Sequence, residues 1–419
     1  MNNHILSENE NIHKLPFLTS EYPGMEGWIK TKDEDFIVEE IPAYEFAGHG
    51  DHVCVLIEKK GMTTQTAVSK LSNELHIQKK YIGFAGLKDA HAITKQWISL
   101  GKVRMSELEN MKIHNLRILK YTRHIDKIHL GDLQGNKFSI SLRDISIPLK
   151  DAVHRIEVIM KILAKRGVPN YFGPQRFGNR SDSHLLGYAI LRDDIDEFLR
   201  LFLGSPKPSE SNILRVARKH YESGEYKKAL QRWPYSFTEQ RRALKILADT
   251  HNKIKAYSAI DNTLKRFLVS AFQSYIFNKV LAARMPEIDQ LYEGDIVYDY
   301  STKTYYPVED LTKEQVRCSN FEISPTGPLP GIEMQRLKGL AGKMENNILD
   351  EIQLTSKQNH NLQFYSQGER RPLRFQAKNC SVSLKKDSLG RFIHLQFELP
   401  PGCYATTLLR EFTKEYKVD

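Results

Sequence analysis

Strand-like segments at both ends of the chain enclose a long helical middle, and this order constrains the fold more than any other feature. DEDFIVEEIP (residues 33–42) and DHVCVLIEKKG (51–61) alternate with the two-residue period of β-strands. KFSISLRD (137–144) and FIHLQFELP (392–400) do the same. Between them, residues 182–285 have helical periodicity. We therefore expect an α+β domain that is closed by both termini, with a second domain inserted between them.

Shorter signals predict the connections. Thr63 and Thr64 can cap the helix that follows them. DLQGN (132–136) predicts a turn, and residues 151–166 predict a helix. In SPTGPLPGIE (324–333), proline and glycine cluster and predict a loop.

Composition indicates a globular protein. A chain of 419 residues exceeds one ordinary core and predicts two or three domains. No apolar run approaches the ~18–20 residues of a membrane helix, and the polar N-terminus has no secretory pattern, so we expect a frayed tail there. The four cysteines are widely separated without a Cys-x-x-Cys pair, which favours the cytoplasm, and no ligand spacing implies a metal.

The charge favours a polyanionic partner. The net charge is +10, with a pI near 9.1. KILAKRGVPNYFGPQRFGNR (161–180) has five basic residues, no acidic residue and three aromatic rings. Guanidinium groups for phosphates beside rings for bases are what single-stranded or looped RNA requires. A solvated basic helix end followed by a turn remains the alternative for this segment.

One carboxylate stands where the apolar flanks predict none. In YIGFAGLKDAHAITKQWISL (81–100), a strand-like half runs into a glycine turn that contains Lys88, Asp89 and His91. Asp89 could simply be the N-cap of a helix that follows it. Gly83 and Gly86, however, allow close approach of a backbone or ligand. No second carboxylate lies close to Asp89 in the sequence, so the pattern shows no sign of the paired carboxylates of acid/base catalysis.

These residues lie in a block that resembles the TruD family of RNA pseudouridine synthases. Five further regions resemble family blocks in family order, so that the resemblance covers residues 26–412. The blocks are GWIKTKDEDFIVEE with GHGDHVCVLIEKKGMTT, GFAGLKDAHAITKQW, HLGDLQGNKFSISLR, GVPNYFGPQRFG, VSAFQSYIFNKVLAAR and ELPPGCYATTLLRE. The resemblance implies isomerisation of uridine in RNA without a cofactor or a metal.

The resemblance also implies roles for single residues. Asp89 falls on the catalytic aspartate, which either attacks C1′ of the ribose or removes the C2′ proton, and Lys30 on a basic residue that pairs with it. Phe138 falls on the ring that packs on the target base, and Asn136 on a polar partner of the site. Tyr404 stands where the family has an aromatic residue. A core role for Phe138 or Tyr404, and a turn role for Asn136, remain open.

The resemblance further implies the domains and the partner. We expect a flexible tail (1–16), a catalytic domain with a mainly antiparallel sheet (17–166 and 373–419) and a helix-rich α/β insert (167–372). In the insert, Arg176 is expected to contact RNA or to support the structure. The substrate would be tRNA, at the uridine in position thirteen, acted on by a cytoplasmic monomer that binds no membrane.

Two other functions are alternatives to this one. A catalytically inactive RNA-binding or chaperone protein of the same fold would not need Lys30, Asp89, Asn136 and Phe138 together. An RNA methyltransferase would need a glycine-rich cofactor loop, which we do not find. The sequence between Gly178 and Ser270 exceeds that of compact bacterial members and resembles longer, archaeal-like forms.

Overall fold

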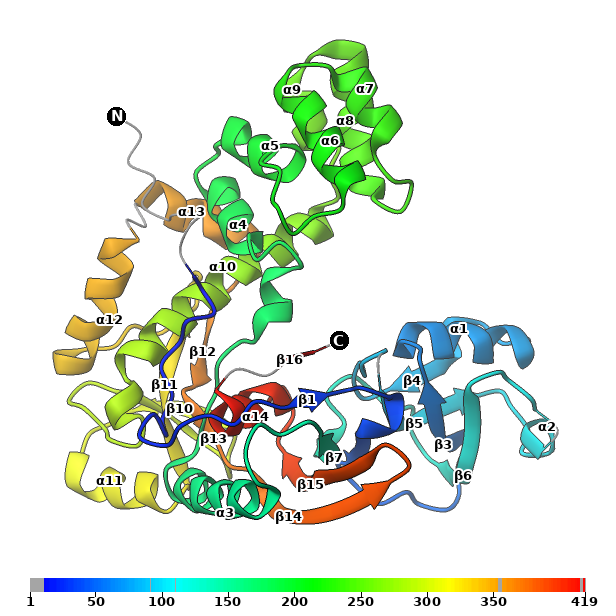
Figure 1. The fold of residues 1–419 in the computed structure, drawn as a ribbon, viewed down its shortest axis with the longest axis vertical. Coiled ribbons are helices and arrows are strands. Elements are labelled where there is room, and N and C mark those ends of the chain that lie inside the picture. Colours follow the sequence, from blue (N-terminus) through cyan, green and yellow to red (C-terminus); the bar gives the residue numbers. More distant parts are fainter. Residues whose placement is uncertain (1–10, 91, 110, 353–355, 415–416, 419) are drawn as a thin grey trace. The chain divides into compact units, whose positions relative to one another are not determined.

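The chain divides into two compact units in the computed structural model, which describes residues 11–90, 92–109, 111–352, 356–414 and 417–418 (Figure 1). The sheet unit contains residues 17–168 and 375–419, and the insert unit contains residues 1–16 and 169–374. Each crossing lies two residues beyond the one expected from the sequence. His91 lies outside the described residues.

The centre of the sheet unit is an eight-stranded sheet built from both ends of the chain. Its strand order is β14-β15-β7-β2-β5-β3-β6, with β4 paired to β5 at the side. In Figure 1, the orange and red β14 and β15 lie beside β7 from the first third of the chain. Every pair is antiparallel except β2 with β5. The strands are β2 Phe36–Pro42, β3 His52–Lys60, β4 Ile82–Phe84, β5 Ile93–Gly101, β6 Leu116–His124, β7 Leu133–Leu142, β14 Lys378–Asp387 and β15 Gly390–Leu399.

Helices and short strands complete this unit. The Thr63 side chain accepts from Thr66 N and caps α1, as the sequence predicted. Apolar side chains of α1 join those of β3 and β5 in one core cluster. The other elements are η1 Asp33–Asp35, α1 Thr64–Glu74, η2 Lys79–Tyr81, α2 Ser106–Glu109, α3 Leu149–Arg166, α14 Ala405–Thr413 and the parallel pair β1 Trp28–Ile29 and β16 Lys417–Val418.

The insert unit combines helices with a four-stranded antiparallel sheet. The buried helix α10 packs against α4, α12 and β11. The sheet order is β10-β9-β11-β12. The helices are η3 Pro174–Phe177, α4 Ser183–Leu191, α5 Ile195–Leu203, α6 Asn212–Glu222, α7 Tyr226–Arg232, α8 Thr238–Thr250, α9 Lys253–Ser258, α10 Asn262–Ala283, η4 Met285–Glu287, α11 Leu311–Ser319, α12 Gly339–Glu351 and α13 Ser356–Tyr365. The strands are β9 Ile296–Asp299, β10 Thr304–Pro307, β11 Ile323–Leu329 and β12 Glu369–Pro372, and two short strands, β8 Val168–Pro169 and β13 Arg374–Phe375, lie where the chain crosses between units.

The loop predicted over residues 324–333 is wrong for its first six residues, which belong to β11. A proline loses its N–H but keeps its carbonyl, and Pro325 O accepts from Leu373 N at 2.9 Å. Gly327 is needed for packing, because a Cβ there would lie 2.9 Å from Leu373 Cδ2 and 3.0 Å from Phe277 Cδ2. Proline and glycine thus belong to a tightly packed strand here.

Two smaller expectations also differ from the structure. Residues 133–136 of the predicted turn are the first residues of β7, because they pair with β2 and, at Asn136, with β15. Residues 11–16, expected in a flexible tail, have contacts inside the insert unit. Ile12 is buried, and the His13 ring lies 2.8 Å from Ser181 Oγ.

Candidate active site

Asp89 lies on the loop that joins β4 to β5 at the edge of the large sheet. Its side chain is 49% exposed, and Lys30 Nζ lies 3.4 Å from its Oδ2. Lys30 itself is mostly covered, because its ammonium lies 4.3 Å from the centroid of the Phe36 ring. Its backbone is left-handed, with φ of 64°. The carboxylate that the sequence singled out is therefore about half exposed and has the Lys30 ammonium beside it.

The backbone of this loop is held by side chains from beneath. Gln96 Nε2 donates to Gly86 O at 2.6 Å, and Thr64 Oγ1 accepts from Lys88 N at 2.9 Å. Thr64 Oγ1 also donates to Gln96 Oε1 at 2.9 Å, which joins the two anchors. On the other side, Gly131 N donates to Ala85 O at 2.8 Å. These groups satisfy backbone donors and acceptors of residues 85–88, and so they fix this part of the loop without regular structure.

Lys88 points away from Asp89 and into the sheet. Its ammonium lies 2.9 Å from Glu40 Oε2 and donates to Asn136 Oδ1 at 2.7 Å. Glu40 and Asn136 face each other across β2 and β7. The side chains of Lys88 and Glu40 are 5% and 1% exposed. Burial raises the pKa of the Glu40 carboxyl, and the Lys88 ammonium opposes that shift. Asn136 therefore belongs to a buried ion-pair network under the loop.

Lys59 is a second buried cation beneath the loop. Its ammonium donates to Asp89 O at 3.0 Å and to Met62 O at 2.6 Å. Burial lowers the pKa of Lys59 to about 8, the Asp89 charge opposes the shift, and the Lys88 charge adds to it. The peptide that carries the Asp89 carboxylate is thus fixed by a lysine from β3.

Phe138 occupies the same sheet face as Asn136. The residue is 7% exposed. Its ring stacks on that of Phe397, with centroids 5.4 Å apart, and meets the Phe36 ring edge-on, with centroids 6.2 Å apart. Phe36 also contacts the Lys30 ammonium, so it connects the Phe138 ring to the Lys30–Asp89 pair. The structure therefore brings Lys30, Asp89, Asn136 and Phe138 together in one unit, while their catalytic roles remain predictions.

The other two candidates are positioned differently. Tyr404 precedes α14, is 40% exposed, and its carbonyl accepts from Thr407 Oγ1 at 2.6 Å. Arg176 lies in the insert unit, where its Nε donates to Ser274 Oγ at 3.0 Å and its Nη2 donates to Ser270 Oγ. Its guanidinium also lies 5.3 Å from the Phe267 ring centroid. Arg176 therefore braces η3 against α10, and a contact with RNA stays a prediction.

Sequence reasoning did not assign Lys59, Glu40 or Thr64 to this site. A signal was present, because Glu40 continues the inward positions of Phe36 and Val38, and Lys59 continues the inward row of β3. A charged residue at an inward position of a strand needs a partner, and here the partners are the loop and its neighbours.

A family model described as tRNA pseudouridine synthase D (TruD) matches residues 13–412. This chain belongs to the TruD family. It is 38% identical to the tRNA pseudouridine synthase D of Geobacter sulfurreducens, over 96% of this chain and 97% of that protein. A solved structure of a Methanosarcina mazei protein, proposed to be tRNA pseudouridine synthase D, superposes with a TM-score of 0.83 at 29% identity and covers 97% of each chain.

The Thermococcus onnurineus relative, described as a probable tRNA pseudouridine synthase D, is 33% identical, and 97% of its length is covered, as it is for the Geobacter sulfurreducens protein. The expected likeness of the sequence between Gly178 and Ser270 to longer, archaeal-like forms stays a prediction.

Two absences hold for the part of this TruD chain that the structure describes. No helix in that part is long and apolar enough to cross a membrane. No group of three or more histidine, cysteine or acidic residues there could hold a metal ion.

Proposed function

We propose that this TruD-family enzyme isomerises uridine to pseudouridine in tRNA at the Asp89 loop, with position thirteen as the target. The observation that supports this best is the geometry of Asp89. Its carboxylate is exposed beside the Lys30 ammonium at 3.4 Å, while its peptide is fixed by the buried Lys59. An exposed group on a fixed backbone can meet a ribose without moving the sheet.

The reaction conserves atoms and needs no redox partner. The bond between N1 and C1′ breaks, uracil turns, and a bond between C5 and C1′ forms. The proton at C5 is lost to solvent, and N1 gains one. In this scheme the Asp89 carboxylate either attacks C1′ or removes the C2′ proton, and both routes need it ionised. Lys30 pairs with that carboxylate at 3.4 Å and orients it.

Phe138 and Asn136 would complete the site for the base. The target must leave its stack, and an aromatic ring stabilises an unstacked base. Phe138 is mostly buried, so its exposed edge would contact the uracil while Phe397 supports its other side. Asn136 would act through Lys88, which holds it in place.

Asp89→Asn tests this assignment in one step, because it keeps the shape and removes the charge. We expect tRNA labelled with tritium at uridine C5 to release tritium with the wild type and not with the variant. Binding of unmodified tRNA should survive. A variant that releases tritium at a rate near that of the wild type would show that Asp89 is not the catalytic carboxylate.

The target position has its own test. Pseudouridines are mapped in tRNA from a strain that lacks the gene, where position thirteen should be an unmodified uridine. If pseudouridine were still found at position thirteen in that strain, the target of this enzyme would be another uridine. We propose a monomer, because the four site residues, Lys30, Asp89, Asn136 and Phe138, come from one chain. We also propose a cytoplasmic location, because free cysteines such as Cys54 and Cys318 stay reduced there.

A further inference from the structure

Most of the net charge of the chain is concentrated in four consecutive helices of the insert unit. These helices, α6 to α9, form what we call the helical arm, residues 211–258 (Figure 1). The arm contains eleven lysines or arginines and four acidic residues, a net charge of +7, while the whole chain has +10. Outside the arm the charges nearly balance, so an electrostatic partner of this chain is attracted chiefly to the arm.

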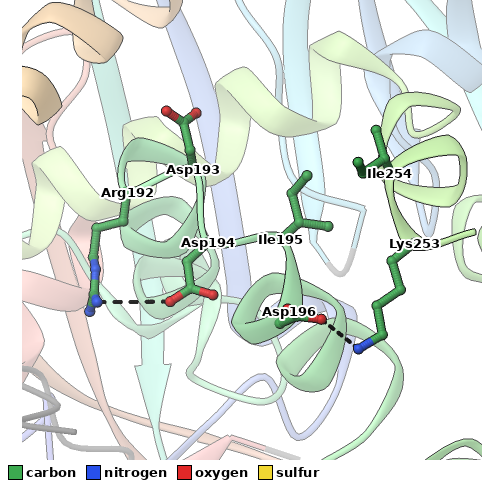
Figure 2. A pocket seen from close by; sticks show the side chains of 7 residues that line it. All are labelled: Arg192, Asp193, Asp194, Ile195, Asp196, Lys253 and Ile254. Atoms are coloured by element: carbon green, nitrogen blue, oxygen red, sulfur yellow. Dashed lines mark hydrogen bonds and ion pairs between the residues drawn. The ribbon is translucent and has the colours of Figure 1, made fainter.

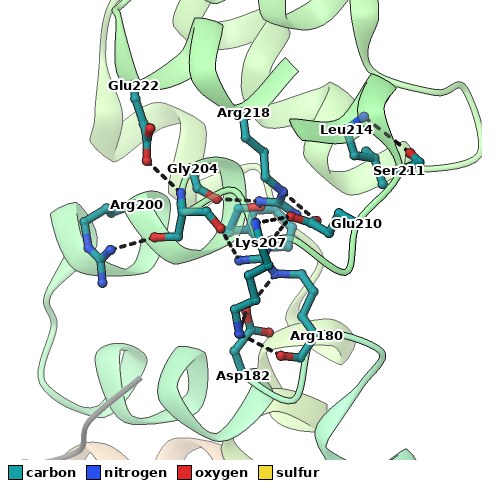
Figure 3. A network of polar contacts seen from close by, with 12 residues as sticks. Arg180, Asp182, Arg200, Gly204, Lys207, Glu210, Ser211, Leu214, Arg218 and Glu222 are labelled. Atoms are coloured by element: carbon teal, nitrogen blue, oxygen red, sulfur yellow. Dashed lines mark hydrogen bonds and ion pairs between the residues drawn. The ribbon is translucent and has the colours of Figure 1, made fainter. Parts of the chain in front are cut away.

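Some arm cations are structural and offer no charge to a partner. Arg218 is 3% exposed and donates to Glu210 Oε1 at 2.8 Å and to the carbonyls of Phe202 and Gly204 (Figure 3). Arg180, outside the arm, lies 2.7 Å from the other Glu210 oxygen. This network joins the base of the arm to α5 and leaves the surface charge to other residues.

The exposed cations fall into a paired and an unpaired group. Those with a carboxylate partner are Lys228 with Glu225, Arg242 with Glu239, and Lys253 with Asp196. Five more are exposed and have no carboxylate within ion-pair distance among the described residues: Lys219, Lys227, Arg232, Lys245 and Lys255. Unpaired cations lose no intramolecular partner when they bind phosphate, so they suit a polyanion.

The pocket beside Lys253 is not part of this surface. It has a volume of about 420 Å³, and its charged lining residues are Asp193, Asp194, Asp196, Arg192 and Lys253 (Figure 2). Arg192 pairs with Asp194 and Lys253 pairs with Asp196, so the lining has no unpaired cation and one more carboxylate than cations. A nucleic acid would therefore follow the unpaired cations of the arm and avoid this pocket.

An exposed aromatic ring accompanies the cations at the junction of α7 and α8. Tyr235 is 86% exposed, the highest exposure among the large hydrophobic residues described. The Arg241 guanidinium lies 4.2 Å from its ring centroid. Arg241 is itself fixed, because it donates to Leu230 O at 2.8 Å and to Trp233 O at 2.5 Å. A flat ring held over a fixed guanidinium is a stacking surface for an unstacked base.

We propose that the helical arm binds tRNA, with its unpaired cations on the phosphates and Tyr235 on an unstacked base. The proposal rests on the function proposed above and adds a second contact with the same substrate. An acidic protein could use the cations, but it has no equal use for an exposed tyrosine beside arginine. The arm therefore supplies affinity and not chemistry.

A triple variant, with Lys227→Gln, Arg232→Gln and Lys245→Gln, removes charge from three sites that no described fold contact uses. We expect the Kd for unmodified tRNA at 0.15 M salt to rise between about tenfold and a hundredfold, with a salt slope lower by about 0.7–0.9 per lost phosphate contact. The kcat for tritium release at saturating tRNA should stay at the wild-type value, while KM rises.

A matched control separates local contacts from net charge. Lys303, Lys313 and Lys343 are exposed, have no carboxylate partner among the described residues and lie in the insert unit outside the arm. Their triple substitution to glutamine removes the same charge and should leave the Kd within about twofold. Equal effects of the two triple variants, or an unchanged Kd in the arm variant, would overturn the proposal.

Tyr235→Ala and Tyr235→Phe test the ring. The alanine variant should weaken tRNA binding, and the phenylalanine variant should restore it, because stacking needs the ring and not the hydroxyl. Equal binding by the alanine variant and the wild type refutes the stacking role. Tritium release by the wild type tests the proposed function separately, so failure of the arm leaves that result unchanged.

Discussion

Removal of Lys88 is expected to destabilise the sheet unit more than removal of any exposed charge. Its ammonium is the cation beside Glu40, at 2.9 Å, and both side chains are almost fully covered. In Lys88→Met, the Glu40 carboxylate keeps, among the described residues, the hydrogen bond from Trp97 N at 3.2 Å. Loss of one partner of a buried ion pair costs about 3–5 kcal/mol, because the remaining charge has no compensation.

The cost should depend on pH in a defined direction. Burial already raises the pKa of Glu40, and Lys88 opposes that shift. Without Lys88, the folded pKa rises further above the unfolded value, so the folded state binds the extra proton. The lost stability is then partly recovered as pH falls, by about 1.4 kcal/mol per unit at most within the window between the two pKa values.

The measurement is urea unfolding followed by tryptophan fluorescence. Trp233 is the tryptophan of the insert unit, so in a Trp233→Phe background Trp28 and Trp97 report the sheet unit. The double variant Lys88→Met/Glu40→Gln removes both charges. Its loss in the free energy of unfolding should be smaller, by about 1–3 kcal/mol, than the sum of the losses in the two single variants. Additive losses, or a Lys88→Met variant as stable as the wild type at pH 7, would refute the reasoning.

Three further outcomes are expected. In the wild type, the pKa of Lys59 is about 8 in the folded state and lies below its unfolded value, so the unfolded chain binds more protons between pH 8 and 10.5. The free energy of unfolding should therefore rise by up to about 3 kcal/mol across that range, and Lys59→Met should remove this rise. Urea midpoints across the range measure it. Phe138→Leu should stay folded but release tritium slowly, whereas Phe138→Ala should lose about 3–5 kcal/mol in urea unfolding. Gly83→Ala should cost about 1–3 kcal/mol, because its Cβ would lie 2.3 Å from Ile128 O; Gly86→Ala, whose nearest atom is 3.9 Å away, should change the urea midpoint little.

Alternation along the strands predicted much of the sheet unit. β15 buries Ile393, Leu395, Phe397 and Leu399 as its pattern indicated. Such patterns depend on local periodicity, which a half-buried sheet imposes on each strand. β11 could not be found in this way, because its proline and glycine are selected by packing against α10 and β12, contacts between distant segments.

The residues of the site also divide into those that a local pattern predicts and those whose position depends on pairing between distant segments. Asp89 and Lys30 could be predicted from the sequence, because each lies in a short block that resembles the family. The direction of Lys88 was not accessible, because Glu40 and Asn136 meet it only after β2 and β7 have paired. Long-range pairing thus decides which of two adjacent charges enters the sheet and which stays at its surface.

This division separates stability from reactivity between two adjacent residues, Lys88 and Asp89. Asp89 is about half exposed, so its pair with Lys30 adds at most about 1 kcal/mol to folding. The groups beneath the loop fix its backbone while leaving the Asp89 carboxylate uncovered. Because only the carboxylate oxygens are free to meet a ribose, substitutions of Asp89 should change rate without stability, and substitutions of Lys59 or Lys88 should change both.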